Sequence, residues 1–487
     1  MNKLKRLAGD AVIYGFSTIL GRLLNWLLMP VLYVRTNEIA ENGAISEILA
    51  FTATLLVLFT YGLETGFFRF SKDGKEKDVF KTSLLMLCTS SSFLIVLTLF
   101  FAPSINNFLG NGNYIFSIYL IGFTIALDAF LSVPFAKLRL NNKALKFAII
   151  KLSNILINIL LNILFLVIIP NLITKNCLPE SIENLYQKFD NVFYIFLSMF
   201  IASAAQFLFF ISDLRKISGS FDKNIAINML KYCWPVLLVG LTGMLIQNSD
   251  KILMSKLTDN GLTDTGLYGV NFKIGVLMSL YTQSFRFAFE PFFFKNGEKG
   301  IKSYAKVMEY FVFIAMIIFL GITLYINVIN SIITNNYAEG NIIIPYVLMG
   351  FLFFGVYYNL SLWYKLTDKT IWAFYFGIIG SVTTISLIFI LIPKMGIIGG
   401  AIAFASGYFI MMILSYIKGQ KIYPIPYNLK KIGIFVITGL LIFFVDSLIS
   451  IECVALSYFV KTCMIGGYIL NFVVMEREVA KNFFRKN

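Results

Sequence analysis

Residues 144–170 read ALKFAIIKLSNILINILLNILFLVIIP, a long apolar run that ends at a proline. An α-helix rises about 1.5 Å per residue, so this run can cross the roughly 30 Å hydrocarbon core of a bilayer. Residues 371–393, IWAFYFGIIGSVTTISLIFILIP, form a second run with the same ending. Both stretches predict transmembrane helices.

The composition extends this prediction to the whole chain. Of the 487 residues, 58% are apolar and 14% charged, whereas soluble proteins have roughly 45–50% and about 25%. We therefore predict an all-α, polytopic membrane protein. Its 14 predicted spans cover residues 9–34, 43–67, 79–102, 113–136, 144–170, 191–213, 232–256, 265–294, 304–330, 342–364, 371–393, 397–417, 431–449 and 453–475.

Several classes of enzyme and binding protein are disfavoured. The chain has no histidine, its five cysteines form no CxxC pair, and neither GxxxxGK[ST] nor GxGxxG occurs. We predict no catalytic residue, metal site or cofactor. The longest predicted connection, 171–190, is too short for a soluble catalytic module, which argues against a membrane polymerase or ligase.

The basic residues are distributed unequally between the two sides of the predicted membrane. Of 41 lysines and arginines, 30 fall at the termini and in alternate loops, six lie on the opposite side and five lie within spans. Because basic loops are retained in the cytoplasm, both termini are predicted to be cytoplasmic. The bilayer thus accounts for the net charge of +15 without a nucleic-acid partner.

The chain contains an internal repeat. Gly43 and Gly266 open the second and eighth spans, while Pro170 and Pro393 end the fifth and eleventh, and both pairs have the same offset in sequence number, 223. Two further matches have an offset of 226: Glu64 with Glu290, and Leu138-Arg139 with Tyr364-Lys365. We predict lobes at 1–223 and 224–420 related by a pseudo-twofold axis along the membrane normal, with two helices and a tail at 421–487.

Local motifs give this arrangement a family resemblance. They are GLETGFFRF (62–70), NSDKIL (248–253), GLYGVNFK (266–273), FRFAFEPF (285–292) and GIIGGA (396–401). With the 6 + 6 + 2 arrangement, they resemble the multidrug/oligosaccharidyl-lipid/polysaccharide (MOP) exporter superfamily, in particular its polysaccharide-exporter (Wzx-type) branch. The resemblance covers nearly the whole chain.

The resemblance implies a flippase of the bacterial cytoplasmic (inner) membrane. Such a protein moves undecaprenyl-pyrophosphate-linked oligosaccharides between leaflets by alternating access, for O-antigen, capsule or exopolysaccharide synthesis. H⁺ and Na⁺ are then candidate coupling ions, and polysaccharide polymerase machinery is a candidate partner. The last two spans are expected to hold the polyprenyl tail.

Three cations within the predicted spans are candidates for substrate binding. Arg22 lies deep in the first span, where it either lines a cavity or pairs with a carboxylate such as Asp128. Arg286 either lines the cavity or contacts Glu290 one turn away. Lys273 occupies a basic position of the family motif, although it can also snorkel to the surface.

The remaining polar candidates within spans are expected to line a cavity or take part in ion coupling. Asp250 either has this role or holds Lys251 or Lys256. Asn158 belongs to a row of asparagines that can equally join helices. The full set of polar candidates is Asn25, Glu64, Asp128, Asn158, Asp250 and Glu290.

Two other transport functions stay open. A peptidoglycan lipid precursor (lipid II) flippase has the same lipid carrier and also 14 helices, but its cavity is richer in arginine. A cation-coupled drug exporter is expected to have 12 spans and acidic cavity residues, so the two appended spans and Arg22 argue against it.

Overall fold

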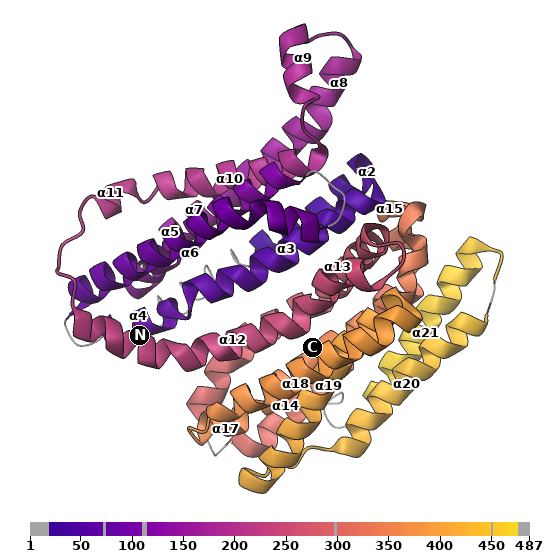
Figure 1. Cartoon of the computed structure of the whole chain (residues 1–487). Coiled ribbons are helices and arrows are strands. Elements are labelled where there is room, and N and C mark those ends of the chain that lie inside the picture. Colours follow the sequence, from indigo (N-terminus) through magenta and orange to yellow (C-terminus); the bar gives the residue numbers. More distant parts are fainter. Residues whose placement is uncertain (1–18, 72–74, 110–113, 297–299, 450, 476–487) are drawn as a thin grey trace. The chain divides into compact units, whose positions relative to one another are not determined.

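The computed structural model describes residues 19–71, 75–109, 114–296, 300–449 and 451–475, and within these ranges it contains helices and no strand. The longer helices are packed side by side within each part of the chain (Figure 1). They are α3 (Ile39–Thr60), α4 (Leu63–Phe70), α5 (Glu76–Phe108), α6 (Ile115–Leu140), α7 (Ala144–Ile163), α10 (Asn191–Leu208), α12 (Lys223–Leu257), α13 (Leu262–Asn296), α14 (Ile301–Leu324), α16 (Ile344–Leu360), α18 (Ile371–Met395), α19 (Ile397–Ile422), α20 (Leu429–Leu448) and α21 (Val454–Met475).

The membrane-spanning prediction is confirmed. Among the described residues, twelve helices are long and apolar enough to cross a bilayer, and each overlaps a predicted span. The other two predicted spans are also helical where described, as residues 19–36 and α13. The described charged residues of α13 include Lys273 and Arg286.

The chain forms two compact units. Unit 1 comprises Met1–Val270 and Thr384–Gly400, and unit 2 comprises Asn271–Thr383 and Ala401–Asn487. Helix α12, which the repeat places in the second lobe, packs against α3, α4 and α5 in unit 1. Compactness and sequence repetition are different properties, so the lobe boundaries at 223 and 420 stay a prediction.

The second predicted span is bent. Its helix is interrupted between α3 and α4, where Tyr61 and Gly62 adopt φ values of 32° and 71°. A glycine reaches this left-handed region without steric cost, which explains the break. The span also begins earlier than residue 43, because Glu38 and Glu41 form a capping box that includes both charged residues in the helix start.

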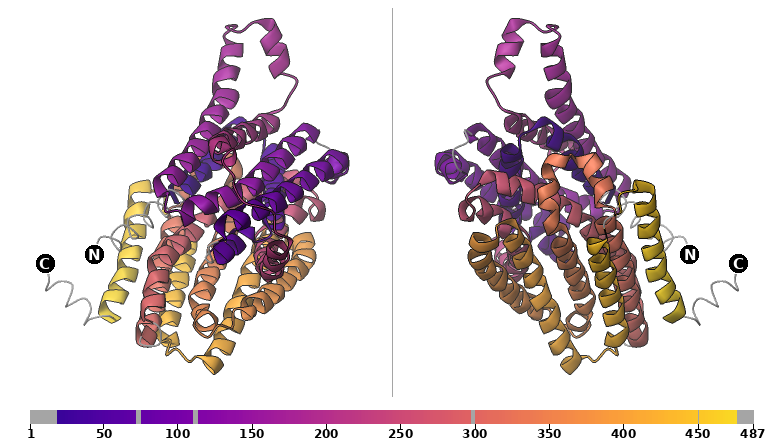
Figure 2. Two further views of the ribbon diagram at one scale, coloured as in Figure 1. Left: turned by 90° about the vertical axis from the view of Figure 1, so that its left-hand side faces the viewer. Right: turned by 90° about the vertical axis from the view of Figure 1, so that its right-hand side faces the viewer.

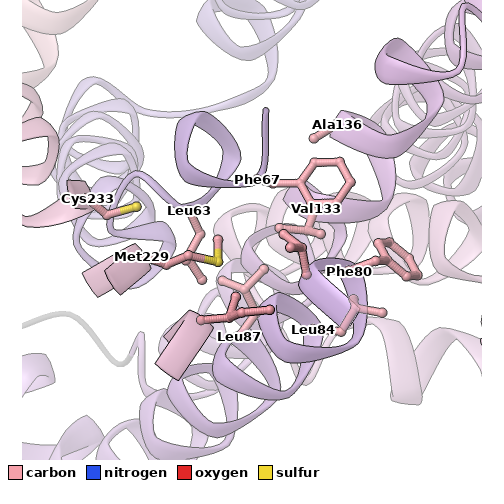
Figure 3. Packing of buried hydrophobic residues seen from close by; sticks show 11 residues of the cluster. Leu63, Phe67, Phe80, Leu84, Leu87, Val133, Ala136, Met229 and Cys233 are labelled. Atoms are coloured by element: carbon pink, nitrogen blue, oxygen red, sulfur yellow. The ribbon is translucent and has the colours of Figure 1, made fainter. Parts of the chain in front are cut away.

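The core of unit 1 at this bend is made by four helices. Leu63 and Phe67 of α4 meet side chains from α5, α6 and α12, including Phe80, Val133 and Met229 (Figure 3). All five side chains are buried. This cluster holds α4 against the first half of α5 and the last turns of α6.

The fifth predicted span is longer than the sequence suggests. After α7, the π-helix η3 (Leu164–Ile168) and α8 (Ile169–Thr174) continue it, and α9 (Glu180–Tyr186) follows. Figure 2 shows α8 and α9 extending past the ends of the other unit 1 helices. The Tyr186 hydroxyl donates a hydrogen bond of 2.7 Å to the Phe165 carbonyl. This bond satisfies a carbonyl in the irregular segment, where a π-helix changes the usual pairing.

Unit 2 has an aromatic core to which the last two spans are attached. The rings of Phe272, Phe351 and Phe404 meet with centroids 5.0–5.6 Å apart. Helices α20 and α21 pack on α14, where Phe313 stacks on Phe472 at 4.0 Å. These two helices have mostly exposed apolar surfaces, as expected for spans that contact lipid.

Candidate functional site

Two cations of unit 2 converge on one aromatic ring. The guanidinium carbon of Arg286 in α13 lies 4.9 Å from the centre of the Tyr358 ring in α16. The ammonium of Lys365, in α17 (Leu362–Leu366), lies 4.4 Å from the same centre and donates a 3.1 Å hydrogen bond to the Tyr358 hydroxyl. Cation–π attraction holds both charges close to the ring. We call these three residues the cation–tyrosine cluster.

The cation–tyrosine cluster has the chemistry of an anion site. Arg286 is exposed. A guanidinium offers a planar fork that matches phosphate oxygens, while an ammonium acts as a compact point charge. Together the two groups can hold a phosphate or pyrophosphate.

Only one member of the cation–tyrosine cluster, Arg286, is a candidate from the sequence. Lys365 belongs to the basic loop residues that set topology, and nothing in the sequence marks Tyr358. One signal is present: Lys365 is the repeat equivalent of Arg139, with an offset of 226. Arg139 forms an ion pair with Glu64 in unit 1. The predicted site residue Glu64 is therefore engaged by a cation from α6.

The other candidates on α13 are described in part. Lys273 also belongs to unit 2 and is half-buried. The side chain of Glu290 lies outside the described residues, so its predicted contact with Arg286 stays a prediction. The ion pair of Glu64 and Arg139 has its repeat equivalents, at the offset of 226, in Glu290 and Lys365. The repeat therefore predicts Lys365 as another partner for Glu290.

The candidates of the first span lie in unit 1. Arg22 and Asn25 belong to the helix at residues 19–27, and both side chains are exposed. Asp128, the carboxylate suggested for Arg22, is acted on by the charge of Lys151 and by the Ser203 hydroxyl. Cavity lining by Arg22 stays a prediction.

The asparagine row of α7 contains a direct contact between two of its members. Asn162 donates from Nδ2 to the Asn158 carbonyl at 2.8 Å and to Asn158 Oδ1 at 3.1 Å. Both residues are buried. These hydrogen bonds lie within α7 and reach no second helix, so cavity lining and helix joining both stay predictions for Asn158.

Asp250 is the centre of a buried network in unit 1. Its Oδ1 accepts from Lys251 Nζ at 2.9 Å, and its Oδ2 accepts from the Tyr268 hydroxyl at 2.5 Å. Lys251 also donates to the Gln247 carbonyl at 2.8 Å. The alternative in which Asp250 holds Lys251 is thus observed, and the buried charge is compensated as such a site requires.

A second buried carboxylate of unit 1 is absent from the sequence-predicted candidates. Glu47 of α3 is fully buried and accepts a 2.8 Å hydrogen bond from Ser255 of α12. Its other oxygen has no hydrogen-bond partner within the described ranges. A signal for it is present in the sequence, since Glu47 falls inside an apolar span, where carboxylates usually have a function or a partner.

The starts of α3 and α13 approach each other through two glycines in unit 1. A Cβ atom on Gly43 would lie 1.9 Å from the Leu262 carbonyl oxygen, and one on Gly266 would lie 2.0 Å from that of Ile39. No larger residue fits either position without moving a helix. The contact is reciprocal, because Ile39 and Leu262 are themselves repeat equivalents with the offset of 223.

One turn further along, Ser46 and Gly269 also face each other and are again repeat equivalents. Reciprocal contacts between equivalent residues are produced by a twofold axis. Equivalent residues meet at two successive turns, as in parallel helices, so the local axis runs along α3 and α13. This geometry supports the predicted orientation of the repeat axis.

Comparison with known proteins identifies the fold. No family model matches the chain, and no curated protein matches its sequence. Among solved structures, an inward-closed lipid II flippase MurJ has a TM-score of 0.75 and 16% identity, over 96% of this chain and 100% of that one. An inward-facing multidrug resistance MATE family transporter of the MOP superfamily has a TM-score of 0.63 and 13% identity, covering 85% and 97%. A MOP superfamily transporter from Pyrococcus furiosus has a TM-score of 0.52 and 12% identity, covering 85% and 95%.

The chain therefore has the fold of MOP superfamily transporters, which confirms the expected fold class. These structural neighbours are flippases and transporters rather than enzymes. The match to the flippase extends over 96% of this chain and the match to the MATE transporter over 85%. At these identities the comparison shows the fold, and the substrate is a separate question.

Proposed function

We propose that this chain is a flippase that moves undecaprenyl-pyrophosphate-linked oligosaccharides across the bacterial inner membrane for surface polysaccharide synthesis. The fold of a MOP transporter supports movement of a substrate between two sides of a bilayer. The observation that carries the proposal is the cation–tyrosine cluster, in which Arg286 and Lys365 converge on Tyr358.

The chemistry of the pyrophosphate explains why such a cluster is useful. A pyrophosphate cannot enter hydrocarbon with its charge uncompensated, so a path through the membrane must supply cations. Arg286 can bind two oxygens at once, and Lys365 adds a second charge. Each hydrogen bond to a charged group contributes about 1.5–3 kcal/mol. That amount is enough to make loss of Arg286 visible in transport.

The contact between α3 and α13 gives the transport cycle a structural element. Alternating access requires the two repeats to rock about a central axis. The tight approach at Gly43 and Gly266 closes the predicted outer ends of two equivalent helices. We infer that these ends separate when the substrate leaves. Either H⁺ or Na⁺ couples to this step, with Asp128 as a candidate coupling group.

The test is transport by the purified full-length chain in vesicles loaded with a fluorescent undecaprenyl-pyrophosphate oligosaccharide. Arg286→Ala should lower the initial rate by about 10- to 150-fold, which corresponds to the loss of about 1.5–3 kcal/mol. Arg286→Lys should retain part of the rate, because charge remains while the fork is lost. Lys430→Gln, an exposed charge outside the cluster, is the matched control. A normal rate for Arg286→Ala would refute the proposal.

A second candidate function is lipid II flipping. It is favoured by the structural match to MurJ, which spans that entire chain. The same vesicles loaded with fluorescent lipid II separate the two candidates, because both substrates carry the same anchor and differ in the head group. Faster transport of lipid II than of the oligosaccharide lipid would support this alternative.

A further inference from the structure

Unit 1 contains a small cavity lined by lysines, separate from the cation–tyrosine cluster. It has a volume of about 150 Å³ and lies where α5, the end of α6 and the segment after α10 meet. The distribution of basic residues assigns this end of the unit to the cytoplasm. We call it the lysine pocket and define it by Lys137, Lys143, Lys216, Asp213 and Phe80.

The lysine pocket has more positive charge than its carboxylate can compensate. Asp213 is already paired with Lys146 of α7 at 2.6 Å. Within the described ranges, no carboxylate lies at salt-bridge distance from Lys137, Lys143 or Lys216, although Glu76 and Asp213 act on Lys137 from further away. The pocket therefore attracts an anion.

One of these charges is held in place by an aromatic ring. The ammonium of Lys137 lies 3.8 Å from the centre of the Phe80 ring, and Phe80 is buried. Cation–π attraction of this kind orients the side chain without neutralising its charge. Lys137 is therefore positioned at the pocket before any ligand arrives.

The position of Lys143 also favours an anion. Lys143 is the N-cap of α7, and the first turn of this helix has no acidic residue. Helix N-termini are stabilised by negative charge and disfavour positive charge. Lys143 and Lys146 thus lie at the end of α7 where positive charge is electrostatically unfavourable. A bound anion would offset this unfavourable interaction. Retention of basic loops in the cytoplasm explains the presence of lysines, but it does not require them to surround one cavity.

The surroundings of the pocket indicate a lipid as the source of the anion. Large apolar side chains on the adjoining helix surfaces are exposed, namely Leu145 and Ile149 of α7 and Leu208 at the end of α10. An acyl chain can cover these side chains while its head group reaches the lysines. The cavity volume equals about five waters at roughly 30 Å³ each, which suits a single phosphate group.

We propose that the lysine pocket binds the phosphate of an anionic phospholipid from the cytoplasmic leaflet. Basic pockets between transmembrane helices on this side are a known way to hold such head groups. The site is distinct from the one proposed for the transported pyrophosphate. It would anchor α6, α7 and α10 to the lipid surface of the membrane, and it does not depend on which substrate is transported.

The test is a lipid titration of the purified full-length chain in neutral detergent, with the melting temperature as the readout. Short-chain phosphatidylglycerol is compared with short-chain phosphatidylcholine, which has the same tails, and with inorganic phosphate. We expect stabilisation by phosphatidylglycerol only. Lys143→Gln/Lys216→Gln should weaken its apparent affinity about 25-fold, from about five-fold for each lysine near a membrane surface. Both residues are exposed, so the variant should fold.

Two further variants make the result specific. Lys143→Arg/Lys216→Arg keeps the charge and should keep the effect, whereas Lys421→Gln/Lys430→Gln removes two exposed charges elsewhere and should behave like the wild type. If inorganic phosphate stabilises the chain as much as phosphatidylglycerol does, the pocket binds an anion, but the proposal that this anion is a lipid head group is wrong. Equal effects of the two lipids, or unchanged affinity in Lys143→Gln/Lys216→Gln, would overturn the pocket itself.

Discussion

Adding one methyl group at Gly43 tests the closure between α3 and α13. The new Cβ would lie 1.9 Å from the Leu262 carbonyl oxygen, whereas an ordinary contact begins near 3.4 Å. Relief therefore requires the helix starts to separate by about 1.5 Å, the difference between these two distances. Overpacking of this kind costs about 1–3 kcal/mol. The cost applies only to the conformation in which the two helix starts touch.

The expected result is a shift of the conformational equilibrium. Destabilising the closed contact by about 1–3 kcal/mol changes the population ratio about 5- to 150-fold in favour of the separated state. Gly43→Ala should therefore slow transport and expose the contact. A Ser46→Cys reporter, placed in a chain without its five native cysteines, should react faster with a membrane-impermeant maleimide, because Ser46 is buried in the closed contact.

The matched control is Gly243→Ala in α12, where a Cβ would meet nothing within 4 Å. This variant should transport and label like the wild type, since alanine favours helix and creates no clash. Gly266→Ala should reproduce Gly43→Ala, because its Cβ would lie 2.0 Å from the Ile39 carbonyl oxygen. Wild-type transport and labelling by Gly43→Ala would refute the role of this contact.

Three further predictions address the charges and the topology. Arg22→Ala should abolish polysaccharide display while the protein stays at near-normal abundance in the membrane, and this abundance is measured with an antibody against an epitope tag. Arg22→Lys should keep part of the display. Normal display by Arg22→Ala would contradict the cavity role. If Lys365 pairs with Glu290 as the repeat predicts, Lys365→Glu should lower the amount of folded protein on native gels. The double variant Lys365→Glu/Glu290→Lys should restore this amount, and absence of rescue would exclude the pair. Reporter fusions after Lys143 should be cytoplasmic and those after Asp190 should be external, and the reverse pattern would contradict the topology.

Hydropathy was sufficient for the architecture because insertion into a bilayer is a local property. Each span of about 20 apolar residues lowers its own free energy in hydrocarbon, whatever its neighbours. The helical spans and the fold class could thus be predicted from the chain alone. Helix ends could not, since they depend on specific polar contacts such as the capping box of Glu38 and Glu41.

The partners of the charged residues depended on the tertiary structure. Arg286 could be selected because a charge within an apolar span is costly. Its neighbours Tyr358 and Lys365 come from other helices far along the chain, and no local pattern relates them. Glu47 illustrates the same limit, because its hydrogen bond to Ser255 joins α3 to α12.

The internal repeat could be predicted from the sequence in part, and its contacts required the tertiary structure. A shared offset of 223 in the sequence numbering was enough to relate Gly43 to Gly266. Only the packed helices show that the two glycines also touch, as do Ser46 and Gly269. Sequence determines which segments are equivalent because duplicated segments keep similar residues. Tertiary structure decides which equivalent faces meet, because close packing depends on the shapes of both surfaces at once.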